Sequence, residues 1–264
     1  TSVLLGSEGN LMQPDEYACR AIKLDSPVLS MGQLEHIRRL NTETFCAVCL
    51  PMLFEPKPGG LEKALGDLFA AADLALQNGA NILVLTDEAA GSEYAPMPAL
   101  LATSGLHQHL VENGMRTRCS LVVAAGDAWE SHHLAALVGY GASAVCPWMA
   151  YGVLEDLARR SLLKIEVADA QKIYLATATK SIVKIMGKMG ISTMRSYHGA
   201  QVFEALGIGH AVVDKYFTGT VPRIVRVGLA EIAAETLERY HAVMKTQAHD
   251  ALPQGGQYTW CTPG

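Results

Sequence analysis

The chain has 264 residues, of which 50% are hydrophobic and 18% are charged, and its formal net charge is −5 at pH 7. This composition predicts a globular protein with a sizeable core and excludes an intrinsically disordered chain. An acidic balance without a long basic run argues against nucleic acid as a main partner. No apolar run reaches the length that spans a bilayer, so the sequence predicts no membrane segment.

The cysteines and the first residues bear on the compartment. Cys46 and Cys49 have CxxC spacing, but on a strand residues three apart point to opposite faces, which suits neither a redox nor a zinc motif. Four of the six cysteines lie in apolar segments, where thiols behave as small hydrophobic groups. The start lacks the basic region of a signal peptide, and the missing initiator Met indicates a processed or excised chain. We expect a reduced, cytoplasmic protein.

Three regions follow one another along the chain. Residues 1–44 are predicted to form an N-terminal extension with turns, a helix over 14–23, and a capping box at Ser30 and Gln33 before a second helix. Residues 45–250 are predicted to form the main α/β domain, and residues 251–264 are predicted to form a linker tail. The main domain is predicted to have strands at 45–50, 82–87, 120–125, 144–146, 191–194 and 210–214, and helices at 61–78, 98–113, 129–139, 151–162, 169–188, 199–206 and 227–245.

Six strands alternating with helices predict parallel pairing with right-handed crossovers, which is an α/β fold. Eight such units would close a (β/α)8 barrel, whereas six make either an incomplete barrel-like sheet or an open doubly wound sheet. The pattern of elements leaves both open.

The polar stretch 188–201 draws attention as a candidate site. It is predicted to be a short strand followed by a turn that carries the phenol of Tyr197, the imidazole of His198 and the amide of Gln201. In α/β folds such side chains gather at the carboxyl ends of strands, where sites are built. A turn with capping residues explains the same pattern equally well. Asp87 also ends an apolar strand, but capping or pairing with a cation is the favoured interpretation there.

Metal and phosphate motifs are weak. His132 and His133 are adjacent, about 100° apart on a helix, so they make no bidentate metal grip and we expect no metal site. Gly207, Gly209 and Gly219 could lend backbone amides to a phosphate, but their spacing is not that of a dinucleotide motif. There is no P-loop and no nucleophile elbow. The residues therefore show no complete catalytic constellation, which fits a domain that packs against others.

Several long motifs resemble the central region of the glutamate synthase large subunit. They are Leu4–Leu11, Asn81–Asp87, Ala95–Ala102, His132–Ala135, Gly139–Ala142 and Gly187–Gln201, followed by Phe203–Ala205. They occur in the order of the family, from residue 1 to about 260. The resemblance implies a domain related to the flavin-bearing barrel of that family, which joins it to the glutamine amidotransferase domain and helps enclose the ammonia route. It also implies no cofactor in this chain, since FMN and the iron–sulfur cluster belong to the adjoining domain.

The chain departs from the family pattern mostly at charged positions. The family usually has arginine where this chain has Glu88 and His198, and asparagine and tyrosine flanking the proline where this chain has Cys146 and Trp148. An arginine can make bidentate contacts that histidine or glutamate does not replace.

We therefore expect a non-catalytic central domain that supports glutamate formation from glutamine and 2-oxoglutarate. Its predicted partners are the amidotransferase and FMN-barrel domains of the same enzyme, and the residues predicted to face them are Asp87, His132, Arg195, Tyr197, His198, Gln201 and Arg223. A stand-alone FMN-binding oxidoreductase barrel, with phosphate near Gly207, Gly209 or Gly219, is the first alternative. A diverged, non-enzymatic interaction module is the second.

Overall fold

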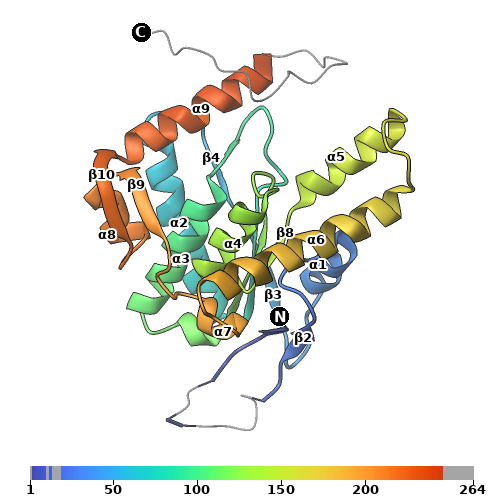
Figure 1. The fold of residues 1–264 in the computed structure, drawn as a ribbon. Helices are drawn as coiled ribbons and strands as arrows, with labels where there is room; N and C mark the ends of the chain where they lie inside the picture. The colour runs from blue at the N-terminus through green and yellow to red at the C-terminus, as the bar shows by residue number, and fades with distance from the viewer. Residues whose placement is uncertain (1, 10–11, 14–18, 246–264) are drawn as a thin grey trace.

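A computed structural model describes residues 2–9, 12–13 and 19–245 of the chain. Its centre is a parallel four-stranded sheet in the order β3-β5-β7-β8 (Figure 1). The strands are Ala47–Pro51, Ile82–Thr86, Ser120–Ala124 and Ala144–Cys146. The order in the sheet follows the order in the chain without a reversal. The two central strands, β5 and β7, are almost wholly buried, as their continuous apolar sequences require.

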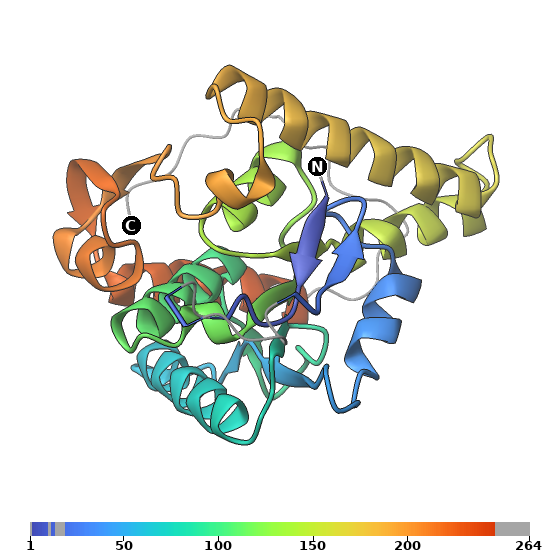
Figure 2. The same ribbon diagram turned by 90° about the horizontal axis from the view of Figure 1, so that it is seen from below.

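Helices connect the strands and cover the sheet (Figure 2). Those that precede or link the four strands are α1 (Met31–Arg38), α2 (Gly60–Gln77), α3 (Ala99–Glu112) and α4 (Ser131–Gly139). Two helices then form an extended pair, α5 (Trp148–Arg159) and α6 (Val167–Lys188), which runs along one side of the molecule. No helix among the described residues is both long and apolar enough to cross a bilayer.

Three two-stranded pairs accompany the central sheet. Two are antiparallel and one, formed last in the chain, is parallel. They are β1 (Val3–Leu5) with β2 (Ile22–Leu24), β4 (Leu53–Phe54) with β6 (Ala95–Pro96), and β9 (Glu204–Ile208) with β10 (Val221–Val227). The remaining helical elements are the 3-10 turn η1 (Arg116–Arg118), α7 (Met194–Tyr197), α8 (His210–Tyr216) and α9 (Leu229–Lys245).

The chain before α1 reaches the outer edge of the sheet. Val28 forms a parallel bridge with Val145 of β8, and the amide of Leu29 donates to the carbonyl of Val145 at 2.9 Å. The helix that follows, α1, packs against β3 at the other edge. The segment that includes Val28 and α1 therefore contacts both edge strands of the sheet, β8 and β3.

The last helix, α9, lies on the side of the carboxyl ends of the sheet, opposite the β1–β2 pair (Figure 1). Tyr240 is its best-buried side chain apart from Thr236, and its hydroxyl lies 2.8 Å from the carbonyl oxygens of both Gly91 and Ser92. These carbonyls belong to the loop between β5 and β6, so the phenol fixes α9 above the end of β5.

Most of the elements predicted between residues 30 and 188 are confirmed, with ends shifted by a few residues. Ser30 Oγ accepts from the Gln33 amide at 3.3 Å while Gln33 Oε1 accepts from the Ser30 amide at 2.9 Å, which is the predicted capping box. Gly79 follows the end of α2 and has φ +90°, a conformation that glycine adopts without strain.

The predictions after residue 188 are mostly wrong, apart from the last helix. Residues 194–197 form the short helix α7 where the sequence predicted a strand at 191–194, because Thr193 caps it by accepting from the Ser196 amide. Residues 204–208 form β9 instead of part of a helix over 199–206, and 210–216 form α8 instead of a strand over 210–214. The strand β10 was not predicted. Near the N-terminus, Ile22–Leu24 pair as β2, where a helix over 14–23 was predicted; residues 14–18 of that helix, like the linker tail 251–264, lie outside the described residues.

Candidate functional site

The predicted site residues lie in two places and not in one. Asp87 lies at the carboxyl edge of the sheet, after β5. The stretch 188–201 was expected at that edge too, but the structure places it on the opposite side. The amide of Gly199 donates to the carbonyl of Gly139, at the end of α4 that leads into β8, and Arg195 pairs with Glu8, whose own amide donates to Thr117 just before β7. The polar residues of α7 therefore flank the amino edge.

Asp87 is buried, with 3% of its surface exposed, and its carboxylate is fully engaged. Oδ2 accepts from the Gly126 amide at 2.8 Å, and Oδ1 accepts from the indole nitrogen of Trp148 at 2.6 Å. Burial raises the pKa of Asp87, while the hydrogen bonds from Gly126 and Trp148 oppose that rise. The carboxylate therefore ties together the ends of β5 and β7 and the start of α5, and leaves little room for a ligand.

Removal of this carboxylate tests the role of Asp87. We expect Asp87→Ala to lower the free energy of unfolding by about 3 kcal/mol, because two buried donors lose their acceptor. Asp87→Asn keeps an oxygen for the indole and is expected to cost about 1 kcal/mol. Urea unfolding followed by circular dichroism measures both values. Equal stability of Asp87→Ala and the unmodified chain would contradict this role.

The acid next to Asp87 has a partner that sequence reasoning missed. Arg38, on α1, forms an ion pair with Glu88 and also donates to Thr86 Oγ1 at 3.2 Å. Glu88 in turn accepts from the hydroxyl of Thr86 at 2.8 Å. Arg38 lies 50 residues before Glu88 and carries no motif, so only the fold could bring it there. The polar groups of Glu88 and Trp148 are thus both paired with residues of this chain.

At the amino edge of the sheet, the rings of Tyr197 and His132 both lie near the ring of Phe203. Tyr197 is fully buried, and its hydroxyl donates to the carbonyl of Ala135 at 3.1 Å. The ring of His132 lies edge-on to Phe203 at 5.7 Å between centroids, and that of Tyr197 at 6.5 Å. Burial raises the pKa of Tyr197 to about 12, so its hydroxyl stays protonated at neutral pH. Tyr197 is a core side chain here, whereas His132 is exposed.

His198, one of the predicted residues, lies in a cluster with Arg116 and His107, and these two partners were missed. Arg116 of η1 donates through Nε to His107 Nδ1 at 2.9 Å, and through its terminal nitrogens to the carbonyls of Cys119 and Gly141 at 2.7 and 2.8 Å. Burial lowers the pKa of His107 to about 3 and that of His198 to about 4, and Arg116 adds to both shifts. Both imidazoles are therefore neutral at pH 7. His198 Nε2 is buried and has no hydrogen-bond partner among the described residues.

The remaining predicted residues are held by short contacts near β9 and β10. Gln201 has φ +54°, and its side-chain amide fills the space at Gly219, where a β-carbon would come within 2.1 Å of Nε2. Arg223 of β10 pairs with Glu204 of β9 at 2.9 Å. Gly209 precedes α8 and donates to the carbonyl of Val227 at 2.7 Å, while Gly207 has φ +82°. No phosphate cradle is formed at Gly219, because Gln201 occupies it.

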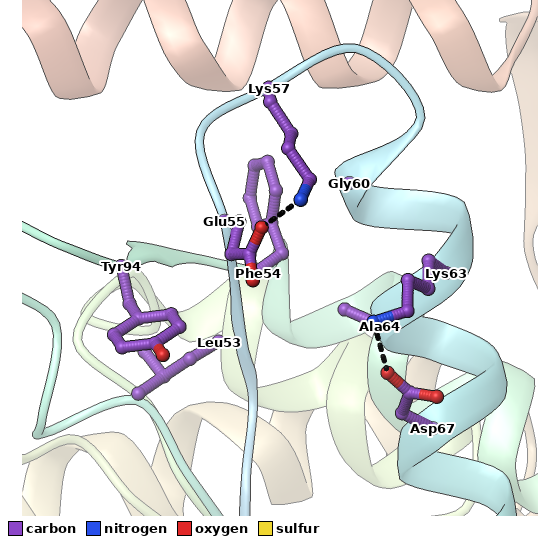
Figure 3. Close-up of a pocket in the computed structure, with 9 residues that line it drawn as sticks. All are labelled: Leu53, Phe54, Glu55, Lys57, Gly60, Lys63, Ala64, Asp67 and Tyr94. Carbon is purple, nitrogen blue, oxygen red and sulfur yellow. Dashed lines mark ion pairs between the residues drawn. The ribbon is translucent and has the colours of Figure 1, made fainter.

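Two pockets lie near these edges. The first, of about 240 Å³, is formed by the loop after β4 and the first turns of α2 (Figure 3). Its lysines are neutralised in place, Lys57 by Glu55 and Lys63 by Asp67, as the dashed lines in Figure 3 show. The second, of about 550 Å³, lies at the amino edge and is lined in part by Glu8, Arg118 and Arg195. Among the described residues no group of three His, Cys, Asp or Glu side chains could hold a metal ion.

Comparison with known proteins identifies the family of this chain. The sequence model described as glutamate synthase central domain matches residues 1–209. The chain belongs to this family. Its relatives include the NADPH glutamate synthase large chain of Bacillus subtilis, 38% identical over 264 residues, and the chloroplastic ferredoxin-dependent glutamate synthase of Spinacia oleracea, 37% identical over 252 residues. The NADH glutamate synthase of Schizosaccharomyces pombe is 35% identical over 237 residues.

The central domain is a small part of these relatives. The alignments cover 100%, 89% and 88% of this chain but only 17%, 15% and 11% of the respective relatives. The resemblance seen in the sequence motifs is thereby confirmed at the level of the family. The names of these three relatives specify NADPH, ferredoxin and NADH, respectively.

Proposed function

We propose that this chain is the connecting domain of a glutamate synthase and performs no chemistry by itself. It would join a glutamine amidotransferase domain to an FMN-bearing barrel and wall part of the path of ammonia between them. The observation that carries the proposal is the match of the whole chain to 17% of a glutamate synthase large chain. The FMN and the iron–sulfur cluster would belong to the neighbouring barrel domain, and the protein would work in the cytoplasm.

The filled carboxyl edge of the sheet supports a scaffold role. In barrel enzymes the loops at that edge build the active site. Here Trp148 and Gly126 occupy the carboxylate of Asp87, Arg38 occupies that of Glu88, and α9 is fixed above the loop after β5. These contacts pair both carboxylates with donors of this chain, which gives them a structural role.

The order of the strands supports a barrel ancestry. A doubly wound sheet reverses its strand order and binds ligands at the reversal, whereas barrel strands follow one another around the ring. The order β3-β5-β7-β8 has no reversal, and the segment at Val28 extends the sheet beyond β8. We propose an incomplete relative of the FMN-linked barrels, with a boundary at residue 44 between the N-terminal extension and the barrel-like domain, which would end at residue 250.

The exposed members of the predicted set are the best candidates for contact with neighbouring domains. His132, Arg195, Gln201 and Arg223 are exposed, and Arg195 lines the larger pocket. Asp87 would instead stabilise the carboxyl edge of the sheet, and Tyr197 and His198 would stabilise the amino edge. An arginine with a single exposed ion pair can exchange its partner for one on another domain at little cost.

Charge reversal at Arg195 tests the coupling role in the full-length protein that carries this sequence. We expect Arg195→Glu to raise the number of glutamine molecules hydrolysed per glutamate formed, because a repulsive contact opens the path of ammonia. The control is Arg159→Glu on α5, which breaks a comparable exposed ion pair with Asp156. Equal ratios for both variants would contradict the role of Arg195.

Flavin binding provides the second test. The purified protein of 264 residues is incubated with FMN, freed of the excess, and its visible absorption is recorded. We expect no retained flavin absorption. A stoichiometric flavin spectrum would overturn the scaffold proposal in favour of a flavin-binding barrel.

A further inference from the structure

The β9–β10 pair stands apart from the central sheet. It lies at one end of the molecule with α8, as both ribbon views show (Figures 1 and 2). Its two strands run parallel, with Val221 opposite Glu204 and Arg223 opposite Leu206. Parallel strands occur almost only in sheets that are covered on both faces. An isolated parallel pair at the surface is therefore an incomplete arrangement.

Four large apolar residues of this pair are exposed to solvent, although Ala205 is buried. The exposed fractions are 71% for Leu206, 49% for Val221, 81% for Ile224 and 46% for Val225. Five of the seven residues of β10 are exposed, so neither face of this strand is covered. Four large exposed apolar side chains thus lie within a few residues of one another on two adjacent strands, and such a concentration marks an interaction surface more often than isolated exposed residues do.

The backbone of β10 is irregular at the most exposed of these residues. Ile224 has φ +52°, in the left-handed region, and the pairing of β10 with β9 shifts in register between Arg223 and Val227. A β-branched residue rarely adopts this conformation. Strained backbone of this kind clusters where a surface binds something.

The charge of the pair indicates the chemistry of its partner. Glu204 is neutralised by Arg223, and Arg226 is exposed without an ion pair to any residue that the structure describes. The pair therefore carries an excess positive charge next to its apolar side chains. An extended segment with apolar and acidic side chains would complement it.

We propose that the exposed edge and faces of β10 are the docking surface for an extended, apolar and acidic segment of another domain of the same polypeptide. The relatives that match this chain are far longer, since it covers 17% of the one from Bacillus subtilis. An unpaired strand edge offers its amides and carbonyls to such a segment as one more strand of the sheet. This inference rests on the proposed connecting role and adds the surface through which the connection is made.

Hydrogen–deuterium exchange of the full-length protein tests the proposal. We expect the amides of residues 221–227 that do not donate to β9 to exchange at least tenfold more slowly than unprotected amides. We also expect Val225→Glu to remove that protection, because it places an acid against an acidic partner. The control is Val183→Glu on α6, whose valine is 42% exposed, and it is expected to leave residues 221–227 unchanged. In both variants, slow exchange at β5 and β7 verifies that the central sheet is folded.

Three outcomes would overturn the docking surface. One is unprotected exchange at 221–227 in the unmodified protein, and another is an equal effect of the two variants. The third is a change of oligomer mass caused by Val225→Glu in light scattering, since this would assign the surface to a second copy. If the protein forms glutamate while the amides of residues 221–227 exchange without protection, the docking surface is rejected and the connecting role is kept. Protection there in a protein that forms no glutamate would reject the connecting role and keep the surface.

Discussion

Lowering the pH from about 7.5 to 5 is expected to cost the folded chain about 4 kcal/mol through two histidines. Burial lowers the pKa of His107 to about 3 and that of His198 to about 4, from an ordinary value of 6.5. Their neutral forms therefore contribute stability that is complete above pH 6.5 and is lost as the pH falls towards the folded values. At pH 5 each contributes a loss of about 2 kcal/mol, because the unfolded chain binds a proton there and the folded chain does not.

Urea unfolding at several pH values, followed by circular dichroism, measures this loss. We expect His198→Gln to remove about half of the pH dependence, since one of the two titrating groups is gone. The exposed His210 provides the control, and His210→Gln is measured in the same way to report the effect of the substitution itself. A free energy of unfolding that stays constant down to pH 5 would show that both imidazoles accept protons in the folded state.

A methyl group at Gly141 is expected to lower the free energy of unfolding by about 4 kcal/mol or more. Gly141 has φ +114°, and a β-carbon there would lie 2.3 Å from Nδ1 of His107. Gly141→Ala would therefore add backbone strain and push His107 away from Arg116, which loses a hydrogen bond to a charged group. For a chain of this size we expect a fall in the melting temperature of roughly 10 °C.

Gly187→Ala is the matched control for Gly141→Ala. Gly187 lies within α6, and a β-carbon there would meet nothing within 4 Å. We expect this variant to raise stability by about 0.5–1 kcal/mol, because alanine favours a helix more than glycine does. If both alanine variants melted at the same temperature as the unmodified chain, the tight contact at Gly141 would be refuted.

The sequence predicts the central sheet well because β5, β7 and β8 are buried on both faces. The segments at β5 and β7 are continuously apolar, and glycines follow several of the helices, so their boundaries are sharp. The segment at α8 was predicted wrongly. Its run of apolar residues suggested a strand, but Val212, Val213 and Tyr216 are buried at helical spacing. The strand β10 gave no signal, because a strand that is exposed on both faces lacks the periodicity on which prediction depends.

The candidate site was predictable only in part, for a related reason. Asp87 and the stretch 188–201 were found because polar residues next to apolar runs are visible in a sequence. The sequence did not show on which edge of the sheet this stretch lies. Residues 194–197 form a short helix and not the end of a strand, and this places the polar turn at the amino edge. Arg38 and Arg116 were missed because their partners, Glu88 and His107, are brought to them by folding.

The attachment of Tyr240 gives the fold a mechanical property. Its hydroxyl holds the last described helix to the carbonyls of Gly91 and Ser92, and this loop directly follows Asp87 and Glu88. A displacement of α9 would therefore act on the loop that follows these two residues at the carboxyl edge of the sheet. The hydroxyl of Tyr240 thus couples the position of α9 to the loop after β5.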